Sequence, residues 1–319
     1  MSASSNDAPA QIDPSSLMRI KNLQLRAKTV VEGFYNGLHR SPFHGFSVEF
    51  SEYRPYTLGD DPRTLDWKLF ARSDRYYIKR YEDETNRRCY LMVDQSKSMG
   101  FGSLDYTKAD YTRTLAATLA HFLTQQRDAV GLMTFDRKVN EFIAARHRPG
   151  HMNRLLASLD QSFVGSGTDL SEPLEQLAAL VSKRGLIILI SDLLSPIDML
   201  RTRLAYLRSR GHEMMILRVN DPAEIEFTLP QAAMIRDMET GKELYIDPEV
   251  AKAQYQANFK EHETQLIAIC ESLGIDLTQM VTNQPMDEAL YQLLSLQTRR
   301  SRGPQRGGSL SAAARGAAT

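Results

Sequence analysis

The stretch YLMVDQSKSMGFGS, residues 90 to 103, holds the side chains best suited to chemistry. An apolar run ends at Asp94, and Ser96 and Ser98 follow at alternate positions. One carboxylate and two hydroxyls are hard oxygen donors, which Mg²⁺ prefers in octahedral coordination together with water. Two glycines soon afterwards ease a sharp bend of the backbone. The D-x-S-x-S spacing therefore predicts a divalent-cation site where a strand ends.

Two later residues extend this predicted site. Thr168 lies in the loop GSGTD ahead of a predicted helix, and Asp192 directly follows the apolar run LIILIS. We expect Thr168 to add a hydroxyl and Asp192 a carboxylate that acts in the second shell. An ion held by so few anionic groups stays electrophilic, so we expect it to accept an acidic side chain from another molecule.

Strands and amphipathic helices alternate through the middle of the chain, and they must position these residues. Nearly continuous apolar runs predict strands at residues 89–94, 129–136, 185–192 and 213–221. Apolar residues at helical spacing predict helices at 105–126, 151–159, 171–182 and 197–210, the first capped by Ser103 or Asp105. This alternation is typical of βαβ units in a parallel sheet with right-handed crossovers.

Each of the four predicted strands ends in aspartate, at Asp94, Asp136, Asp192 and Asp221. The carboxyl ends of the strands share one edge of an open α/β sheet, where ligands bind. Aspartate also closes strands as a turn former or helix cap, and we favour that interpretation for Asp136 and Asp221. A degenerate site, in which the other residues also merely cap helices, stays open as an alternative.

The remaining segments divide the chain into a main domain with flanking parts. We predict a disordered N-terminus over 1–16, an accessory segment over 17–87, a main domain over 88–296 with an insertion near 224–247, and a disordered arginine, glycine and alanine tail over 297–319. The accessory segment begins with one or two helices up to residue 38. The insertion has short strands joined by an ETGK turn, and a long helix (248–273), a strand (274–282) and a last helix follow.

Composition argues against several classes of partner. Lys plus Arg and Asp plus Glu both number 39, so the chain has no net charge to attract nucleic acid or anionic membranes. The basic stretch RHRPGHMNR contains His147 and His151, but nothing fixes partners for them as metal ligands. Cys89 and Cys270 lie in apolar runs typical of buried thiols in a reducing compartment. With no secretory signal and no apolar run of about 18 residues, we expect a cytoplasmic protein without a transmembrane segment.

An enzyme is the main rival interpretation. A strand-end aspartate also begins phosphatases that form an aspartyl-phosphate, in which Asp94 would be the nucleophile. Such hydrolases use D-x-D, whereas the second position here is Ser96, and neither a G-x-S-x-G elbow nor a P-loop occurs. The charged stretch DDPRTLDWK, residues 60 to 68, also invites a catalytic interpretation, but we favour packing of the accessory segment. We therefore expect no catalysis.

The order and context of the candidate ligands resemble a known metal centre. Asp94, Ser96 and Ser98 after an apolar strand, Thr168 in a glycine-containing loop and Asp192 at a later strand end resemble the metal-ion-dependent adhesion site of von Willebrand factor A domains. The resemblance implies an α/β fold with a doubly wound, mostly parallel sheet. It also implies that these five residues bind Mg²⁺, or Mn²⁺ or Ca²⁺, directly or through water.

The larger frame resembles the bacterial family named domain of unknown function 58. The similarity covers roughly residues 30–296, and YRPYTLGDDPRTLDWK is its most specific stretch, with TGKELYIDPE, LGIDLTQMVT and DEALYQLL further on. This resemblance implies a protein-interaction module that binds a partner's carboxylate through a divalent cation. It further implies a role beside a MoxR-type AAA+ ATPase in the assembly or maturation of other proteins, without specific nucleic-acid binding.

Overall fold

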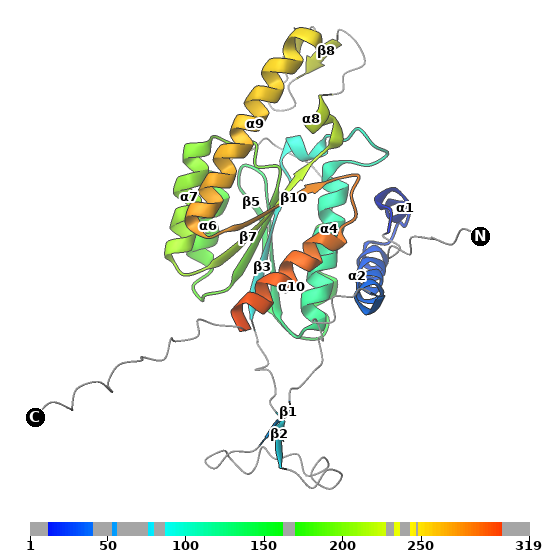
Figure 1. Cartoon of the computed structure of the whole chain (residues 1–319), viewed down its shortest axis with the longest axis vertical. Coiled ribbons are helices and arrows are strands. Elements are labelled where there is room, and N and C mark those ends of the chain that lie inside the picture. The colour runs from blue at the N-terminus through cyan, green and yellow to red at the C-terminus, as the bar shows by residue number, and fades with distance from the viewer. Residues whose placement is uncertain are drawn as a thin grey trace, which may run out of the picture.

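A six-stranded sheet forms the centre of the computed structural model, which describes residues 12–40, 53–55, 76–79, 87–161, 170–227, 233–236, 243–246 and 248–301. The strands are β3 (Arg88–Asp94), β4 (Ala129–Phe135), β5 (Val139–Arg146), β6 (Leu186–Ser191), β7 (Glu213–Asn220) and β10 (Asp276–Val281). Their spatial order is β10-β7-β6-β3-β4-β5 (Figure 1). Only β5 runs antiparallel to its neighbour, as its weak alternation predicts. The sheet confirms the predicted doubly wound, von Willebrand factor A-like fold class.

Helices cover both faces of the sheet. One face packs against α4 (Lys108–Gln125), α5 (His151–Leu159) and α10 (Asp287–Ser301), and α1 (Pro14–Met18) and α2 (Leu23–Arg40) pack on the outer side of α4. The other face packs against α6 (Ser171–Leu180), α7 (Ile197–Ser209) and α9 (Pro248–Leu273) (Figure 1). The central strands β3, β6 and β7 are apolar along nearly their whole length because helices exclude water from both sides.

Two short antiparallel pairs lie outside the main sheet. Strand β1 (Tyr53–Pro55) pairs with β2 (Tyr77–Lys79) in the predicted accessory segment. Strand β8 (Ala233–Arg236) pairs with β9 (Glu243–Ile246) in the predicted insertion, at the top of Figure 1. The ETGK turn and the charged stretch 60–68 lie outside the described residues.

Several element ends differ from the sequence predictions. Helix α1 begins at Pro14, inside the segment predicted to be disordered, because Asp13 caps it and Leu17 is buried. Helix α4 begins after Thr107, which forms a capping box with Asp110, and not after the earlier candidate caps. Helix α10 continues to Ser301, past the predicted start of the tail. The predicted disorder over 1–11 and 302–319 lies outside the described residues.

A short helix that was not predicted from the sequence overlaps the start of the predicted insertion. Helix α8 (Pro222–Glu226) directly follows β7. Asp221 is its N-cap, Pro222 occupies the first turn, and Glu224 completes a capping box. These local signals outweigh the β-branched and aromatic residues that follow them.

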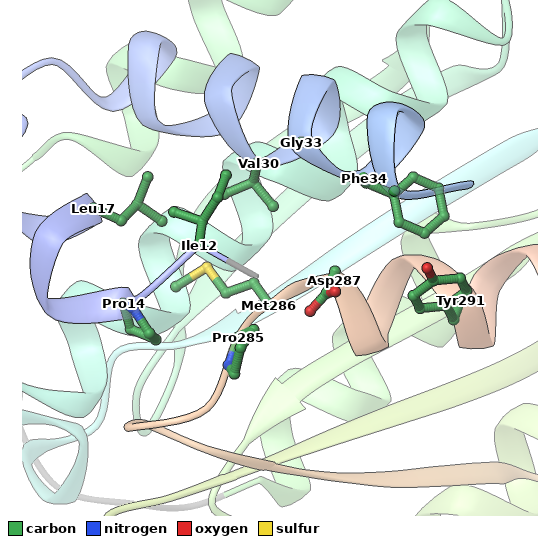
Figure 2. A pocket seen from close by; sticks show the side chains of 11 residues that line it. Ile12, Pro14, Leu17, Val30, Gly33, Phe34, Pro285, Met286, Asp287 and Tyr291 are labelled. Carbon is green, nitrogen blue, oxygen red and sulfur yellow. The ribbon is translucent and has the colours of Figure 1, made fainter. Parts of the chain in front are cut away.

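The N-terminal helices pack against the beginning of α10 and leave a small pocket there (Figure 2). Its volume is about 30 Å³, and most of its lining is apolar, including Ile12, Leu17, Val30, Phe34 and Met286. A Cβ on Gly33 would lie 2.7 Å from Ile12 Cδ1, the movable end of that side chain. None of the predicted metal ligands lines the pocket.

Both cysteines are buried and form no disulfide, as predicted. Across the described residues, every helix is too short or too polar to cross a membrane.

Gly131 lies where β4 passes closest to β5. A Cβ on Gly131 would lie 2.9 Å from Ala145 N, 2.9 Å from Ile143 O and 2.7 Å from Tyr90 Cδ1. We expect Gly131→Ala to lower the free energy of unfolding by about 1–3 kcal/mol, because two backbones would have to separate. Urea unfolding measures this change, with the exposed Ala144→Ser on β5 as control. Equal stability of the two variants would contradict the close approach.

Candidate metal centre

The loop after β3 gathers the first three predicted ligands. Asp94 ends the strand, and its Oδ1 accepts a hydrogen bond from Ser96 N at 2.8 Å. The 3-10 helix η2 (Lys97–Gly100) then turns the chain, so that Ser98 Oγ lies 3.1 Å from Ser96 Oγ. One carboxylate and two hydroxyls thus lie together at the carboxyl edge, as the D-x-S-x-S spacing predicts.

Asp192 joins this group from the end of the neighbouring strand β6. Ser98 lies near enough to the carboxylate of Asp192 to lower its pKa, and Ser191 Oγ donates to Asp94 Oδ2 at 2.5 Å. The structure therefore brings four of the five predicted ligands together. Thr168 lies outside the described residues, and its role stays a prediction.

Burial sets the charge of Asp94. Its side chain is 1% exposed, and this burial, together with the nearby charge of Asp192, raises the pKa of Asp94 to about 7. Hydrogen bonds from Ser191 and Ser96 oppose this rise but do not cancel it. A cation beside Asp94 would favour its ionised form.

Asp192 already has a cation. Lys108, the first residue of α4, places Nζ 2.8 Å from Asp192 Oδ2 and 2.6 Å from Glu224 Oε1. Burial alone would raise the pKa of Asp192, but Lys108, together with hydrogen bonding by Ser98 and Leu194 N, lowers the pKa below its usual range. Burial would likewise lower the pKa of Lys108, but Asp192 and Glu224 together raise it. The pair is therefore ionised although both side chains are fully buried.

The donor set fits a hard divalent ion. Its described members are hydroxyl and carboxylate oxygens, the ligand types of Mg²⁺, Mn²⁺ and Ca²⁺. Within the described ranges, no group of three or more His, Cys, Asp or Glu side chains is placed to hold a metal ion. Of the two carboxylates, Asp192 contacts a lysine, whereas Asp94 is hydrogen-bonded among the described residues by Ser96 N and Ser191 Oγ and by no cation.

Asp221 braces the loop that carries these ligands. Its carboxylate accepts hydrogen bonds from Ser103 N (2.9 Å), Ser103 Oγ (2.5 Å) and Ala223 N (2.9 Å), and from Thr282 Oγ1 at 3.4 Å. One buried side chain therefore ties the loop after β3 to helix α8 and to the end of β10. The structural role expected for Asp221 is confirmed.

The other expected structural residues also make local contacts. Asp136 Oδ1 accepts a hydrogen bond from Lys138 N at 3.2 Å, which is a turn-forming contact. His151 Nε2 lies 2.7 Å from Val130 O in the interior, and His147 is exposed.

Sequence reasoning missed Lys108, Ser191 and Glu224. A signal for Lys108 was present, because a lysine in the first turn of a helix is disfavoured by the helix dipole unless a carboxylate compensates it. The D-P-A-E sequence that begins at Asp221 was a visible capping box and placed Glu224 at the same edge.

Removal of the brace should loosen the ligand loop. We expect Asp221→Ala to lower the free energy of unfolding by about 2–4 kcal/mol, because four hydrogen bonds to a buried carboxylate are lost. Amide hydrogen exchange in residues 100–107 should accelerate at the same time. The control is Asp105→Ala, an exposed carboxylate on the same loop. Unchanged exchange in Asp221→Ala would show that the loop holds its conformation without this residue.

Two mycobacterial proteins are similar to this chain in sequence. The uncharacterized protein Rv1480 of Mycobacterium tuberculosis is 28% identical over 257 residues, which cover 76% of this chain and 80% of that protein. An uncharacterized protein of Mycobacterium avium is 26% identical over 143 residues, 44% of this chain and 83% of that protein.

Similar solved structures have low identity. An aerotolerance-related membrane protein from Bacteroides fragilis (TM-score 0.47, 13% identity) and BatB from Bacteroides thetaiotaomicron (TM-score 0.45, 14% identity) each match 67% of this chain and 99% of theirs. The SpRpn10 VWA domain matches 65% of this chain and 94% of its own, with a TM-score of 0.40 and 13% identity. These scores are too low to support a conclusion about function.

The family profile described as Protein of unknown function DUF58 matches residues 52–265. This match covers more than half of the chain and includes the whole candidate metal centre, so the chain belongs to the DUF58 family.

Proposed function

We propose that this protein is a metal-dependent interaction module. In this proposal Asp94, Ser96, Ser98, Thr168 and Asp192 hold Mg²⁺, or Mn²⁺ or Ca²⁺, directly or through water. The von Willebrand factor A-like fold is consistent with a protein-interaction module. The bound ion would supply a Lewis-acidic position for a carboxylate oxygen of the partner.

The observation that carries the proposal is the convergence of hydroxyls on a buried carboxylate that lacks its own cation. Asp94 is oriented by Ser96 N and Ser191 Oγ, and its pKa is raised by burial and by Asp192. Loss of a proton from Asp94 therefore favours the arrival of a cation, and a cation favours that loss.

The exposure of the residues around the site is consistent with a protein partner. Ser98 is half-buried, whereas Asp94 and Asp192 are almost inaccessible, so an incoming group reaches the site from the side of Ser98. Leu194 lies two residues beyond Asp192 and is 45% exposed. A partner that offers a carboxylate beside an apolar side chain would match both features.

The identity of the partner is part of the proposal and rests on the family resemblance. We propose that the chain acts with a MoxR-type AAA+ ATPase or its client in protein assembly or maturation. A pull-down with and without Mg²⁺ tests this association. Binding that persists in a chelator would contradict the metal-dependent mode.

The hydrolase alternative lacks a supporting observation. Phosphatases that form an aspartyl-phosphate use D-x-D, whereas Ser96 occupies the second of these positions here and cannot act as their general acid. We therefore propose that the chain is not an enzyme.

Asp94→Ala tests the metal site. We expect titration calorimetry with Mg²⁺ or Mn²⁺ to give saturable binding for the wild-type chain and none for the variant, because the only carboxylate of the D-x-S-x-S loop is gone. The fold should persist, since removal of Asp94 relieves a buried charge. Asp105→Ala, with its exposed carboxylate nearby, should bind like the wild type.

Two outcomes would contradict this prediction. Unfolding of Asp94→Ala, seen by near-UV circular dichroism, would mean that Asp94 is structural. Equal affinity in the wild type and Asp94→Ala would place the ion elsewhere.

A further inference from the structure

We propose that Lys108 is an internal counter-cation that sets the divalent affinity of the metal centre and links this affinity to helix α8. The proposal rests on the metal binding proposed above and goes beyond it. It assigns a function to a buried lysine that is not itself a ligand.

Lys108 occupies a position that disfavours a positive charge. It is fully buried, and it stands in the first turn of α4, where the helix dipole is positive. An ammonium group has donors and no acceptor, so burial requires anionic partners. Asp192 and Glu224 are those partners, and they come from different elements, the end of β6 and helix α8.

Glu224 is held in place by the cap of its own helix. Glu224 Oε2 accepts a hydrogen bond from Asp221 N at 2.9 Å, while Oε1 contacts Lys108 Nζ. Asp221 in turn holds Ser103 of the ligand loop. The loop, the lysine and α8 therefore form one connected set of contacts.

A second cation contacts Asp192 from the opposite face of the sheet. Arg218 of β7 donates from Nε to Asp192 O at 3.3 Å, and its side chain is 1% exposed. The guanidinium carbon lies 4.9 Å from the centre of the Phe259 ring, and Nη1 lies 3.6 Å from Glu263 Oε1. Arg218 thus links helix α9 to the backbone carbonyl of Asp192. It leaves the carboxylate of Asp192 charged.

The charges explain why Lys108 matters for the ion. Counted over Asp94, Asp192, Glu224 and Lys108 alone, the charge is −2 once a bound ion has displaced the proton of Asp94. This charge balances a divalent cation. Removal of Glu224's charge leaves Lys108 undercompensated and repels the ion, whereas removal of Lys108's charge leaves an excess of carboxylate and attracts it.

Opposite shifts in metal affinity test the proposal. We expect Glu224→Gln to weaken Mg²⁺ binding about tenfold. Loss of a residue that supports a metal ligand typically weakens metal affinity by about 10–100-fold, and this change is at the lower end. The control is Glu226→Gln, which makes the same charge change on the same helix at an exposed position. Lys108→Met should tighten binding, and the double variant Lys108→Met with Glu224→Gln should return close to the wild-type affinity, because its net charge is again −2.

Titration calorimetry with Mg²⁺ alone distinguishes the outcomes. Equal affinities for Glu224→Gln and Glu226→Gln, or a double variant that fails to recover, would overturn the role of Lys108 while the metal site stands. Absence of saturable binding in the wild type would overturn the metal site and this inference together. If Lys108→Met does not fold, the two glutamine variants decide, because each keeps the buried lysine.

Discussion

Two carboxylates buried side by side at the ends of β3 and β6 impose the main constraint on this protein. A parallel sheet brings them to one edge, and burial makes their negative charges unfavourable unless cations or donors compensate them. Asp192 is compensated by Lys108, while Asp94 receives only a hydroxyl and an amide. This asymmetry leaves one carboxylate satisfied within the chain and the other suited to an ion from solution.

The same edge explains how distant segments are held together. Helix α8, the loop after β3 and the end of β10 are far apart in sequence, yet Asp221 contacts all three. Hydrogen bonds hold the backbone in place at this edge, because the loops there lie beyond the apolar packing between strands and helices. The geometry of the loop that carries the candidate ligands therefore depends on a residue just ahead of the insertion.

The sequence was sufficient for the sheet and for most of the site, and the reasons are physical. Strands that are apolar throughout and helices with 3.6-residue spacing determine a doubly wound fold, and aspartate at strand ends then locates Asp94 and Asp192. The partnership of Lys108 with Glu224 could not be predicted, because it joins elements 116 residues apart across the edge. Helix α8 was missed because its capping signals are short and precede a stretch with strand-like composition.

The length of α9 has a geometric consequence for any partner. Its 26 residues span about 39 Å, whereas the six residues of β6 span roughly 20 Å, so part of the helix has no strand to cover. Figure 1 shows this part rising past the carboxyl edge beside α8 and β8. It forms a wall along one flank of that edge and obstructs approach from that flank. A partner of the proposed site would therefore have to approach from another side, in a restricted orientation.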